Sequence, residues 1–444
     1  MKSEKHERCT AMQIEYSELD FEKIDAFFSC PRPDLCIQRL TELIGGKSRG
    51  RGVVIKLYLE DFKDFNETFG FHFGEMFLRK IARYLASLEG ADVYRTAGVE
   101  FIIIFDKLKY AAPILEEISK RFESGWNIEG IDCLCSINLA AVTYPGKSGS
   151  AKELLEQLGY AISEAARLGP NRYCFFDDTL QVKLYRRNSI AAFLSTAIDK
   201  GLMEMRYRPA FNVKEGRFTH ADSYMYLLHP EFGRIMAGEF MPIAEETGQI
   251  YKVSNYAIQK GCELISMLRE KNIDFEKISI PISPVQFMQK RFVADVEAAL
   301  NVARIPVEQL AFDVSENVLF SSFAASHSCM NELVEMGINI IFNNFGAGYT
   351  GITNILNMPV SMVRLGRFTV WQVSNDAKGV ALVEGLVHIA KNLKLTVIAE
   401  GVETKKQVRL LKKYGCDYLQ GFFFAPTLSV EELIVAMQRT DFGK

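Results

Sequence analysis

The sequence lacks a long hydrophobic run and an excess of charge of one sign. No apolar segment in its 444 residues approaches the ~20 residues that a membrane-spanning helix needs. The charged N-terminus also lacks the apolar core of a signal peptide. The formal net charge is −3, so no general basic field favours nucleic acid or an acidic membrane. We therefore expect a cytoplasmic protein with no membrane span and no nucleic-acid partner.

The cysteines are scattered and odd in number, nine in all, which does not suggest a disulfide framework. Cys133 and Cys135 alternate in a strand-like run and have no second Cys pair or His pair nearby. They are therefore expected to pack in the core. Apolar residues make up 48% of the chain and charged residues 24%, which is ordinary for a globular protein of two or three domains.

The first half of the chain alternates between strand-like and helix-like segments. A dense apolar run at 52–59 has strand length, and the apolar residues of 74–90 recur at helical spacing. Residues 92–105 indicate two strands joined by a turn, and 133–144 indicate another strand. Residues 150–169 predict a helix that Gly169 and Pro170 end.

The second half indicates a barrel. Residues 177–200 are rich in helix formers and contain no Gly or Pro, so they predict a helical linker. Beyond them, about eight strands alternate with amphipathic helices such as 378–393, which indicates a (β/α)₈-type barrel. The expected strands are 203–211, 219–227, 277–283, 309–314, 338–342, 362–366, 395–399 and 418–425.

Nine residues stand near the ends of these strands, where the site of such a barrel forms. They are Asp222, Pro281, Asp313, Asn343, Asn344, Arg364, Gly366, Glu400 and Gln420. A two-metal hydrolase needs several carboxylates around its cations, and this ring supplies three. An ion pair between Arg364 and Glu400 across the mouth is one arrangement that these residues allow.

Residues 187–440 resemble the EAL domain, a family of barrel phosphodiesterases that linearise cyclic di-GMP. The resemblance lies in "FMPIAEETGQI" at 240–250, "NNFGAGYTGI" at 343–352, "AEGVETKKQ" at 399–407 and "QGFFFAP" at 420–426. It implies a modified (β/α)₈ TIM barrel.

Residues 46–176 resemble the GGDEF domain, the diguanylate cyclase family. The matching features are "EDFKDFN" at 60–66, Gly70, Gly74 and "RTAGVEF" at 95–101. The resemblance implies an α/β domain with a mostly antiparallel central sheet flanked by helices. Residues 1–45 are either an N-terminal extension or the opening helices of this domain. The tandem order is a common bacterial signalling architecture.

The EAL-like half departs from its family at most positions that hold metal. Asp222 begins the tripeptide that names the family, where a glutamate is expected, and Asp313 also replaces a glutamate. Proline at 281 replaces an asparagine ligand and has no side-chain oxygen. Asn343 and Asn344 stand for paired aspartates, Arg364 and Gly366 stand for a Lys-x-Asp motif, and Glu400 and Gln420 are retained. We expect no catalysis and no metal; Asp222 and Asp313 are weak candidates for one cation, and Mg²⁺ or Mn²⁺ is expected only if activity is retained.

The GGDEF-like half also departs from its family at positions that hold metal. Tyr58 and Glu60 stand for the Asp-x-Asp of the first strand, and Val99 and Glu100 stand in the motif that names the family. Valine neither ligates Mg²⁺ nor orients a nucleophile, so no cyclase activity is expected. The nucleotide-binding candidates of this half are Asn66 and Glu75 at the guanine-recognising positions, with Lys63 beside them.

These substitutions predict a catalytically inactive signalling protein that acts as an adaptor or regulator through an unidentified protein partner. Homodimerisation through the loop from Phe345 to Tyr349 is one expectation, because the family couples this segment to a dimer interface. One alternative is a receptor for cyclic di-GMP or GTP, in which Arg208 and Tyr226 occupy positions that hold the dinucleotide. Another is a residual phosphodiesterase with an altered metal site.

Overall fold

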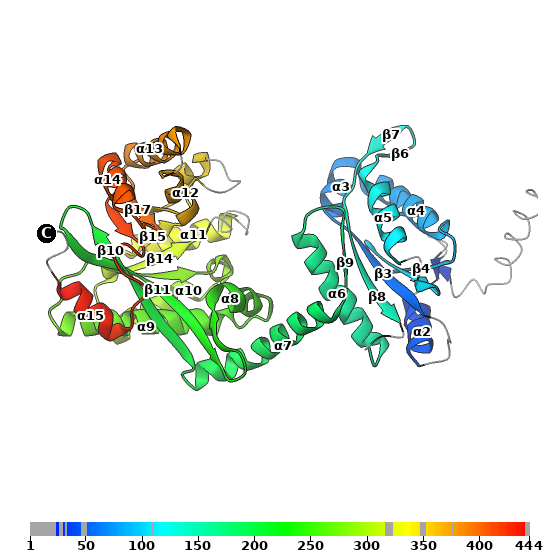
Figure 1. Ribbon diagram of the computed structural model, residues 1–444, viewed down its shortest axis with the longest axis horizontal. Coiled ribbons are helices and arrows are strands. Elements are labelled where there is room, and N and C mark those ends of the chain that lie inside the picture. The colour runs from blue at the N-terminus through cyan, green and yellow to red at the C-terminus, as the bar shows by residue number, and fades with distance from the viewer. Residues whose placement is uncertain are drawn as a thin grey trace, which may run out of the picture. The chain divides into compact units, whose positions relative to one another are not determined.

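A computed structural model describes residues 24–25, 30–31, 33–45, 51–108, 111–144, 146, 148–315, 323–346, 352–374 and 376–439. Its contacts divide the chain into two compact units, Met1–Arg186 and Arg187–Lys444. We describe each unit by itself (Figure 1). No helix of the described ranges has both the length and the apolarity that crossing a membrane requires.

The first unit is built on a five-stranded sheet in the order β4-β5-β3-β8-β9. All neighbours pair antiparallel except β8 and β9, which confirms the expected mostly antiparallel sheet. The central strand is almost entirely apolar because both of its faces are covered. The strands are β3 (Gly52–Leu59), β4 (Ala91–Ala97), β5 (Glu100–Phe105), β8 (Ile137–Tyr144) and β9 (Arg172–Phe175).

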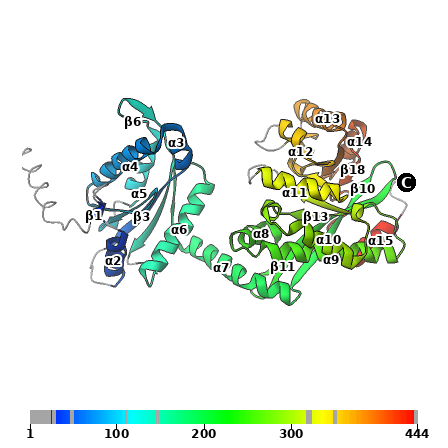
Figure 2. The same ribbon diagram turned by 180° about the vertical axis from the view of Figure 1, so that it is seen from behind.

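Helices cover both faces of this sheet (Figures 1 and 2). Val53, Ile55 and Leu57 share a core with α3 (Phe62–Phe69), α4 (Phe71–Ala86) and α5 (Ala111–Glu123). Val54, between them on the strand, lies in the opposite core with α2 (Pro33–Ile44) and α6 (Ala151–Arg167). This alternation follows from the two-residue period of a strand.

The N-terminal residues 1–45 were expected to be an extension or the opening helices of the first domain. Helix α2 lies within this range and buries Cys36, Leu40 and Leu43 against the sheet. A short pair, β1 (Ile24–Asp25) and β2 (Cys30–Pro31), precedes it. Residues 1–23, 26–29 and 32 lie outside the described ranges.

The strand expected at 133–144 is wrong in its first part. A separate hairpin of β6 (Trp126–Ile128) and β7 (Ile131–Cys133) ends at Cys133, and β8 begins only at Ile137. The hairpin turns at Glu129 and Gly130, whose φ angles of 50° and 86° are left-handed. Cys133 and Cys135 are both buried in the core, as expected.

The second unit is a closed barrel. Its sheet runs in the order β10-β18-β17-β16-β15-β14-β13-β11-β12, and an additional pairing between β10 and β11 closes it. β10 is antiparallel to both of its barrel neighbours, whereas the sequence β11-β13-β14-β15-β16-β17-β18 is parallel, which confirms a modified TIM barrel. The strands are β10 (Met203–Asn212), β11 (Arg217–His229), β12 (Gly233–Met236), β13 (Lys277–Ile282), β14 (Leu310–Val314), β15 (Asn339–Phe342), β16 (Met362–Leu365), β17 (Thr396–Glu400) and β18 (Tyr418–Gln420).

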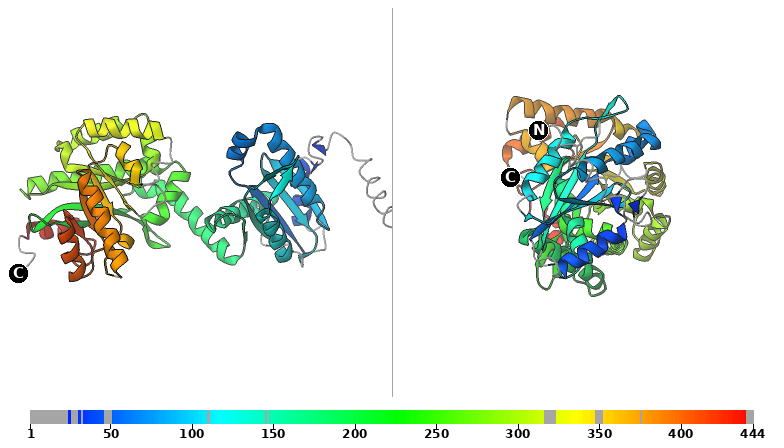
Figure 3. Two further views of the ribbon diagram at one scale, coloured as in Figure 1. Left: turned by 90° about the horizontal axis from the view of Figure 1, so that it is seen from above. Right: turned by 90° about the vertical axis from the view of Figure 1, so that its right-hand side faces the viewer.

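The barrel has an apolar interior and an outer helical layer. Six inward side chains, among them Ala311, Ile341 and Ile398, form a small cluster inside the barrel. The last strand is shorter than expected, because Gly421 has a φ of 153° that turns the chain after Gln420. The outer helices are α8 (Ala237–Glu246), α9 (Ile250–Glu270), α10 (Phe292–Ala303), α11 (Phe323–Glu335), α12 (Arg367–Gln372), α13 (Ala377–Asn392), α14 (Lys405–Tyr414) and α15 (Val430–Gln438) (Figure 3).

Helix α7 (Asp178–Asp199) corresponds to the linker expected at 177–200. The division between the two units falls within it, after Arg186. Its C-terminal half contributes Ile190, Leu194 and Ala197 to the barrel core. The helix therefore begins in one unit and ends packed in the other.

Candidate functional site

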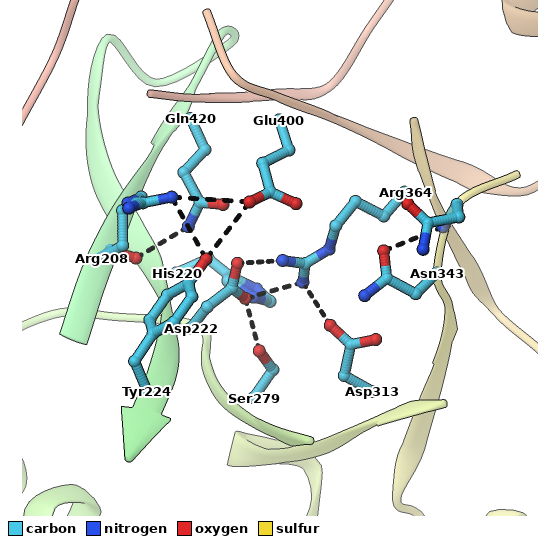
Figure 4. Close-up of polar contacts among 11 residues, drawn as sticks. Arg208, His220, Asp222, Tyr224, Ser279, Asp313, Asn343, Arg364, Glu400 and Gln420 are labelled. Carbon is cyan, nitrogen blue, oxygen red and sulfur yellow. Dashed lines mark hydrogen bonds and ion pairs between the residues drawn. The ribbon is translucent and has the colours of Figure 1, made fainter. Parts of the chain in front are cut away.

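The barrel mouth gathers polar side chains from β10, β11, β14, β16, β17 and β18 (Figure 4). Strand register places Asp222 beside both Arg208 and Ser279, and it places Pro281 beside Asp313. Parallel strands end at the same edge of the barrel, so residues far apart in sequence converge there.

Arg364 occupies the centre of this site and is 2% exposed. Its Nη1 and Nη2 donate to the two carboxylate oxygens of Asp222, with 2.8 Å between Nη2 and Oδ1. The same Nη2 lies 2.9 Å from Oδ2 of Asp313. The pair between Arg364 and Glu400 that the sequence allowed does not form among the described residues, because the guanidinium on β16 reaches the acids of β11 and β14 instead.

Asp222 has two further partners. Its Oδ1 accepts a hydrogen bond from Oγ of Ser279 and lies 3.1 Å from Nε2 of His220. Burial alone would raise the pKa of Asp222, but the Arg364 charge and the contact with His220 hold that pKa below its usual range. Asp222 is therefore a buried carboxylate whose negative charge is already satisfied by the protein.

Asp313 differs from Asp222 in its electrostatics. Burial raises the pKa of Asp313 to about 7; the Arg364 charge opposes this shift, while the charges of Asp222 and Glu400 add to it. A group with this pKa is partly protonated at neutral pH. Asp313 is therefore a poor source of anionic oxygen for a divalent cation.

The third acid, Glu400, belongs to a second cluster. Its Oε1 accepts a hydrogen bond of 3.3 Å from the hydroxyl of Tyr224 and lies 3.5 Å from Nη1 of Arg208. The Arg208 guanidinium stacks over the rings of Tyr224 and Phe422, at 4.8 and 5.6 Å from the ring centroids. Nε2 of Gln420 donates to the carbonyl of Arg208 and holds the strand end in place.

The paired amides at the end of β15 contact neighbouring backbone. Oδ1 of Asn343 accepts a hydrogen bond from the backbone of Asn344, which is exposed and has a φ of 57°. A Cβ added at Gly366 would lie 2.4 Å from Oδ1 of Asn344. The side-chain amide of Asn344 thus occupies the space that the family's aspartate would need at position 366.

These residues fit a divalent cation poorly. Mg²⁺ requires near-octahedral oxygen ligands, and Pro281 offers no side-chain oxygen at the end of β13. A cation that bridged Asp222 and Asp313 would meet the guanidinium of Arg364 between them. The three acids of the mouth share two arginines, Arg364 and Arg208, and Asp313 is partly protonated, so little negative charge remains to attract a cation.

The two acids among the cyclase-side candidates, Glu60 and Glu100, each contact another side chain of the same unit. Glu60 accepts a hydrogen bond from Asn138, and burial, with repulsion from Asp61, raises its pKa. Glu100 forms an ion pair of 2.9 Å with Lys56. Tyr58 is partly exposed on β3, and Val99 packs against the core from the β4–β5 turn.

Asn66 and Glu75, the candidates for guanine recognition, lie on the neighbouring helices α3 and α4, whereas Lys63 pairs with another residue. Asn66 on α3 lies against α4, where a Cβ added at Gly74, next to Glu75, would meet its Oδ1 at 1.9 Å. That Oδ1 is buried without a hydrogen-bond partner among the described residues. Lys63 is 87% exposed and pairs with Glu67 at 3.7 Å, one helical turn away.

Sequence reasoning missed three residues of the barrel site: His220, Ser279 and Tyr224. His220 and Tyr224 alternate with Asp222 on β11, so the two-residue period of a strand placed all three on one face. Tyr226 continues this face, and the Arg234 guanidinium stacks 5.2 Å from its ring centroid.

The loop from Phe345 to Tyr349 is described only at its start. Phe345 is buried, and its backbone nitrogen donates to the carbonyl of Arg364 at 2.9 Å. Gly346 has a φ of 79° and lies against Leu386. The remaining residues of this loop, and Glu316 after β14, lie outside the described ranges, so the expected dimer contact stays a prediction.

Two family models match the chain. The model of the EAL domain matches residues 191–427, and that of "Diguanylate cyclase, GGDEF domain" matches residues 35–172. The bifunctional diguanylate cyclase/cyclic di-GMP phosphodiesterase MucR of Pseudomonas aeruginosa is 26% identical over 87% of this chain and 57% of its own length. The signaling protein YkoW of Bacillus subtilis is 26% identical over 92% of this chain and 52% of its own length. The chain thus spans about half the length of these relatives.

Two solved structures are similar. The S helix-GGDEF-EAL structure of Vibrio cholerae LapD, bound to c-di-GMP, covers 94% of this chain and 99% of its own with a TM-score of 0.60 and 19% identity. This likeness supports the order and fold of the two domains. The PaMucR phosphodiesterase in complex with c-di-GMP covers 55% of this chain and 99% of its own with a TM-score of 0.52 and 27% identity.

Proposed function

This chain belongs to the EAL domain family and carries a GGDEF domain ahead of its EAL domain, and we propose that neither domain turns over nucleotide. Proteins with this pair of domains act in cyclic di-GMP signalling. In our proposal the chain regulates that signalling through contacts with a protein partner.

One observation carries the proposal: the guanidinium of Arg364 lies between Asp222 and Asp313, within 2.9 Å of both. Metal-assisted phosphodiester hydrolysis needs cations that activate water and neutralise phosphate charge. A guanidinium supplies fixed positive charge but no coordination site for water, because it has donors and no lone pair.

The cyclase side supports the same conclusion. Cyclisation of GTP requires cations held by acids near the 3′-hydroxyl and the phosphates, and Val99 is apolar. The two acids that remain, Glu60 and Glu100, are bound to Asn138 and Lys56. These contacts already engage one carboxylate oxygen of each acid.

Action through a partner is supported by exposed apolar residues beside the altered site. Helix α12 begins directly after Gly366 and exposes 69% of Phe368. Arg367 stacks over the rings of Phe368 and Trp371, at 5.4 and 4.8 Å. Aromatic and arginine side chains of this kind are enriched at protein interfaces.

The test combines turnover with partner binding. Purified protein is incubated with cyclic di-GMP or GTP and Mg²⁺ or Mn²⁺, and the products are separated by chromatography; we expect no linear dinucleotide and no cyclic product. Crosslinking in cells that produce the protein should trap a partner, and the variant Phe368→Ala should lose it while Val302→Ala, which removes another exposed apolar side chain on α10, keeps it. Steady turnover that disappears in Glu400→Ala would overturn the proposal.

A second candidate, a cyclic di-GMP receptor without turnover, is favoured by Arg208. Its guanidinium lies at the mouth between the ring of Tyr224 and that of Phe422, which is 66% exposed. Arginine binds phosphate, and an exposed aromatic ring stacks on a base. Calorimetry with cyclic di-GMP, with and without Mg²⁺, tests this candidate, and absence of heat at millimolar nucleotide rejects it.

A further inference from the structure

A groove runs between α9 and α10, two outer helices of the barrel that lie side by side (Figure 2). It has a volume of about 760 Å³. The lining residues of α9 recur every three or four positions from Asn255 to Glu270, which corresponds to about 22 Å of helix. The groove therefore follows α9 for about four turns, a length that suits another helix.

Small side chains leave this groove open. Helix α10 contributes Ala298, Ala299 and Ala303 to the lining, and α9 contributes Cys262 and Ser266. Side chains of this size do not fill the space between the outward faces of two neighbouring helices. A hollow remains that larger apolar side chains from elsewhere can enter.

Exposed apolar side chains stand in the same lining. Val302 of α10 is 86% exposed, the largest fraction for any large apolar side chain in the described part of the chain, and Met267 of α9 is 38% exposed. Apolar surface that is exposed and bordered by polar groups marks a site of interaction.

The charge of the lining has one sign. It contains three carboxylates, Glu263, Glu270 and Asp295, and neither lysine nor arginine. Glu263 is paired with Lys260 at 2.6 Å. Within the described ranges, Glu270 and Asp295 form no ion pair. Two carboxylates in the groove are therefore left without a cation.

These two acids lie toward opposite ends of the groove. Helix α9 leads into β13 and α10 leads into β14, and the two strands are parallel, so the two helices run in the same direction. Asp295 is in the first turn of α10, whereas Glu270 is the last residue of α9. The C-terminus of a helix carries partial negative charge, so Glu270 stands where a cation is favourable.

We propose that this groove binds an amphipathic helix of a partner protein, with apolar side chains along its middle and lysine or arginine toward both ends. Apolar side chains at helical spacing fill the hollow beside Met267 and Val302. Basic side chains face Asp295 and Glu270, which gives the groove its preference among amphipathic helices. The groove is carried by other helices than α12, so this contact is separate from the one proposed at Phe368.

The test uses three fluorescently labelled peptides of about 16 residues, a length that spans the groove. The first is composed of leucine and lysine, with leucine at helical spacing. The second has the same composition in an order that leaves no apolar face, and the third has glutamate in place of lysine. Fluorescence anisotropy follows their binding to the full chain. We expect saturable binding of the first, at least tenfold weaker binding of the second and none of the third.

Matched charge variants show whether the acids of the groove select the peptide. Glu270→Gln with Asp295→Asn should weaken binding of the leucine–lysine peptide about tenfold, because two ion pairs with the peptide are lost. Glu297→Gln with Glu335→Gln removes two exposed acids outside the lining and should leave binding unchanged. Equal binding of the lysine and glutamate peptides, or equal losses in the two double variants, would overturn the proposal.

Filling the groove is the second test. Ala298→Trp places a large side chain in the hollow and should abolish peptide binding, whereas Ala294→Trp, exposed on the same helix but outside the lining, should retain it. Phe368→Ala should also retain it. Binding that survives Ala298→Trp would place the peptide elsewhere and reject the groove.

The same variant reports other occupants of the groove. If a second copy filled it, the wild type would sediment as a dimer and Ala298→Trp as a monomer. If a segment of the same chain filled it, Ala298→Trp would expose that segment to proteolysis. Either result would overturn the proposal. A failure here leaves the proposed loss of turnover untouched, because α9 and α10 carry none of the residues of the barrel mouth.

Discussion

Arg364 donates through both terminal nitrogens to the carboxylate of Asp222, and the two side chains are only 2% and 5% exposed. Their positions are 142 residues apart in the chain, yet β11 and β16 bring them together across the barrel. A bidentate pair of this kind fixes the direction of both groups. The cluster around it is the basis of the predictions below.

Removal of Arg364 is expected to destabilise the barrel. The variant Arg364→Ala leaves Asp222 and Asp313 buried without their cation, and breaking a buried pair in this way costs about 3–5 kcal/mol. Urea denaturation measures the loss. Arg234→Ala, which breaks a 2.8 Å pair with Glu204 at the surface, is the control and should cost less than about 1 kcal/mol. Equal losses in the two variants would contradict the burial argument.

The stability of the barrel should depend on the protonation of Asp313. The folded-state pKa of about 7 lies above the unfolded value of about 3.9. The folded state therefore binds this proton more tightly, so the stabilisation is complete below about pH 4 and is lost as the pH rises through 7.

The variant Asp313→Asn keeps the shape of the side chain and removes this titration. Between pH 5 and pH 8, the urea midpoint of the wild type should fall relative to that of this variant. Asp222 has the opposite effect on stability. Because its pKa is lowered in the folded state, its contribution to the free energy of unfolding is lost only as the pH falls into the acid range. A constant difference across this range would show that Asp313 does not titrate there.

Restoring the paired aspartates alone should not restore hydrolysis. In the variant with Asn343→Asp and Asn344→Asp, Arg364 still separates Asp222 from Asp313, and Pro281 still offers no ligand. We expect no linear dinucleotide from this variant with Mn²⁺. Adding Asp222→Glu, Pro281→Asn, Asp313→Glu, Arg364→Lys and Gly366→Asp returns the remaining ligands and should yield product. Hydrolysis by the double variant would mean that the arginine does not block the metal position.

If the barrel binds cyclic di-GMP, Arg208 should determine its affinity. Ligand at 100 times its Kd stabilises a protein by about 2.7 kcal/mol, which thermal denaturation detects. Arg208→Ala should lose this stabilisation. Arg206→Ala, on the same strand but paired with Glu204 and Glu432, is the matched control and should retain it. Equal shifts in both variants would exclude Arg208 from the ligand site.

The sequence predicted the elements of the barrel better than the contacts at its mouth. Strand alternation and helix period located most strands, because burial imposes them locally. A pair between Arg364 and Glu400 was one arrangement that the sequence allowed, because both stand at strand ends, and spacing along the chain does not give the reach of a side chain across a barrel. The partners of Asp222, His220 and Ser279, were missed for the same reason.

Departures from the expected strands have local causes. The hairpin of β6 and β7 was not predicted, and the strand expected at 133–144 includes Cys133, the last residue of β7, because the hairpin's turn at Glu129 and Gly130 lies before the apolar run. The C-terminal part of the strand expected at 418–425 does not form, because Gly421 turns the chain. In both places the determining feature is a backbone conformation at one or two residues, which apolar periodicity does not report.

The cation at the centre of the barrel is part of the polypeptide. Every folded chain therefore carries this positive charge, and its presence does not depend on the concentration of any free ion. Chelators and magnesium or manganese starvation, which strip an enzyme that borrows its positive charge from solution, leave the Arg364 guanidinium where it is. The positive charge that Arg364 brings to this mouth therefore does not depend on the metal supply of the cell.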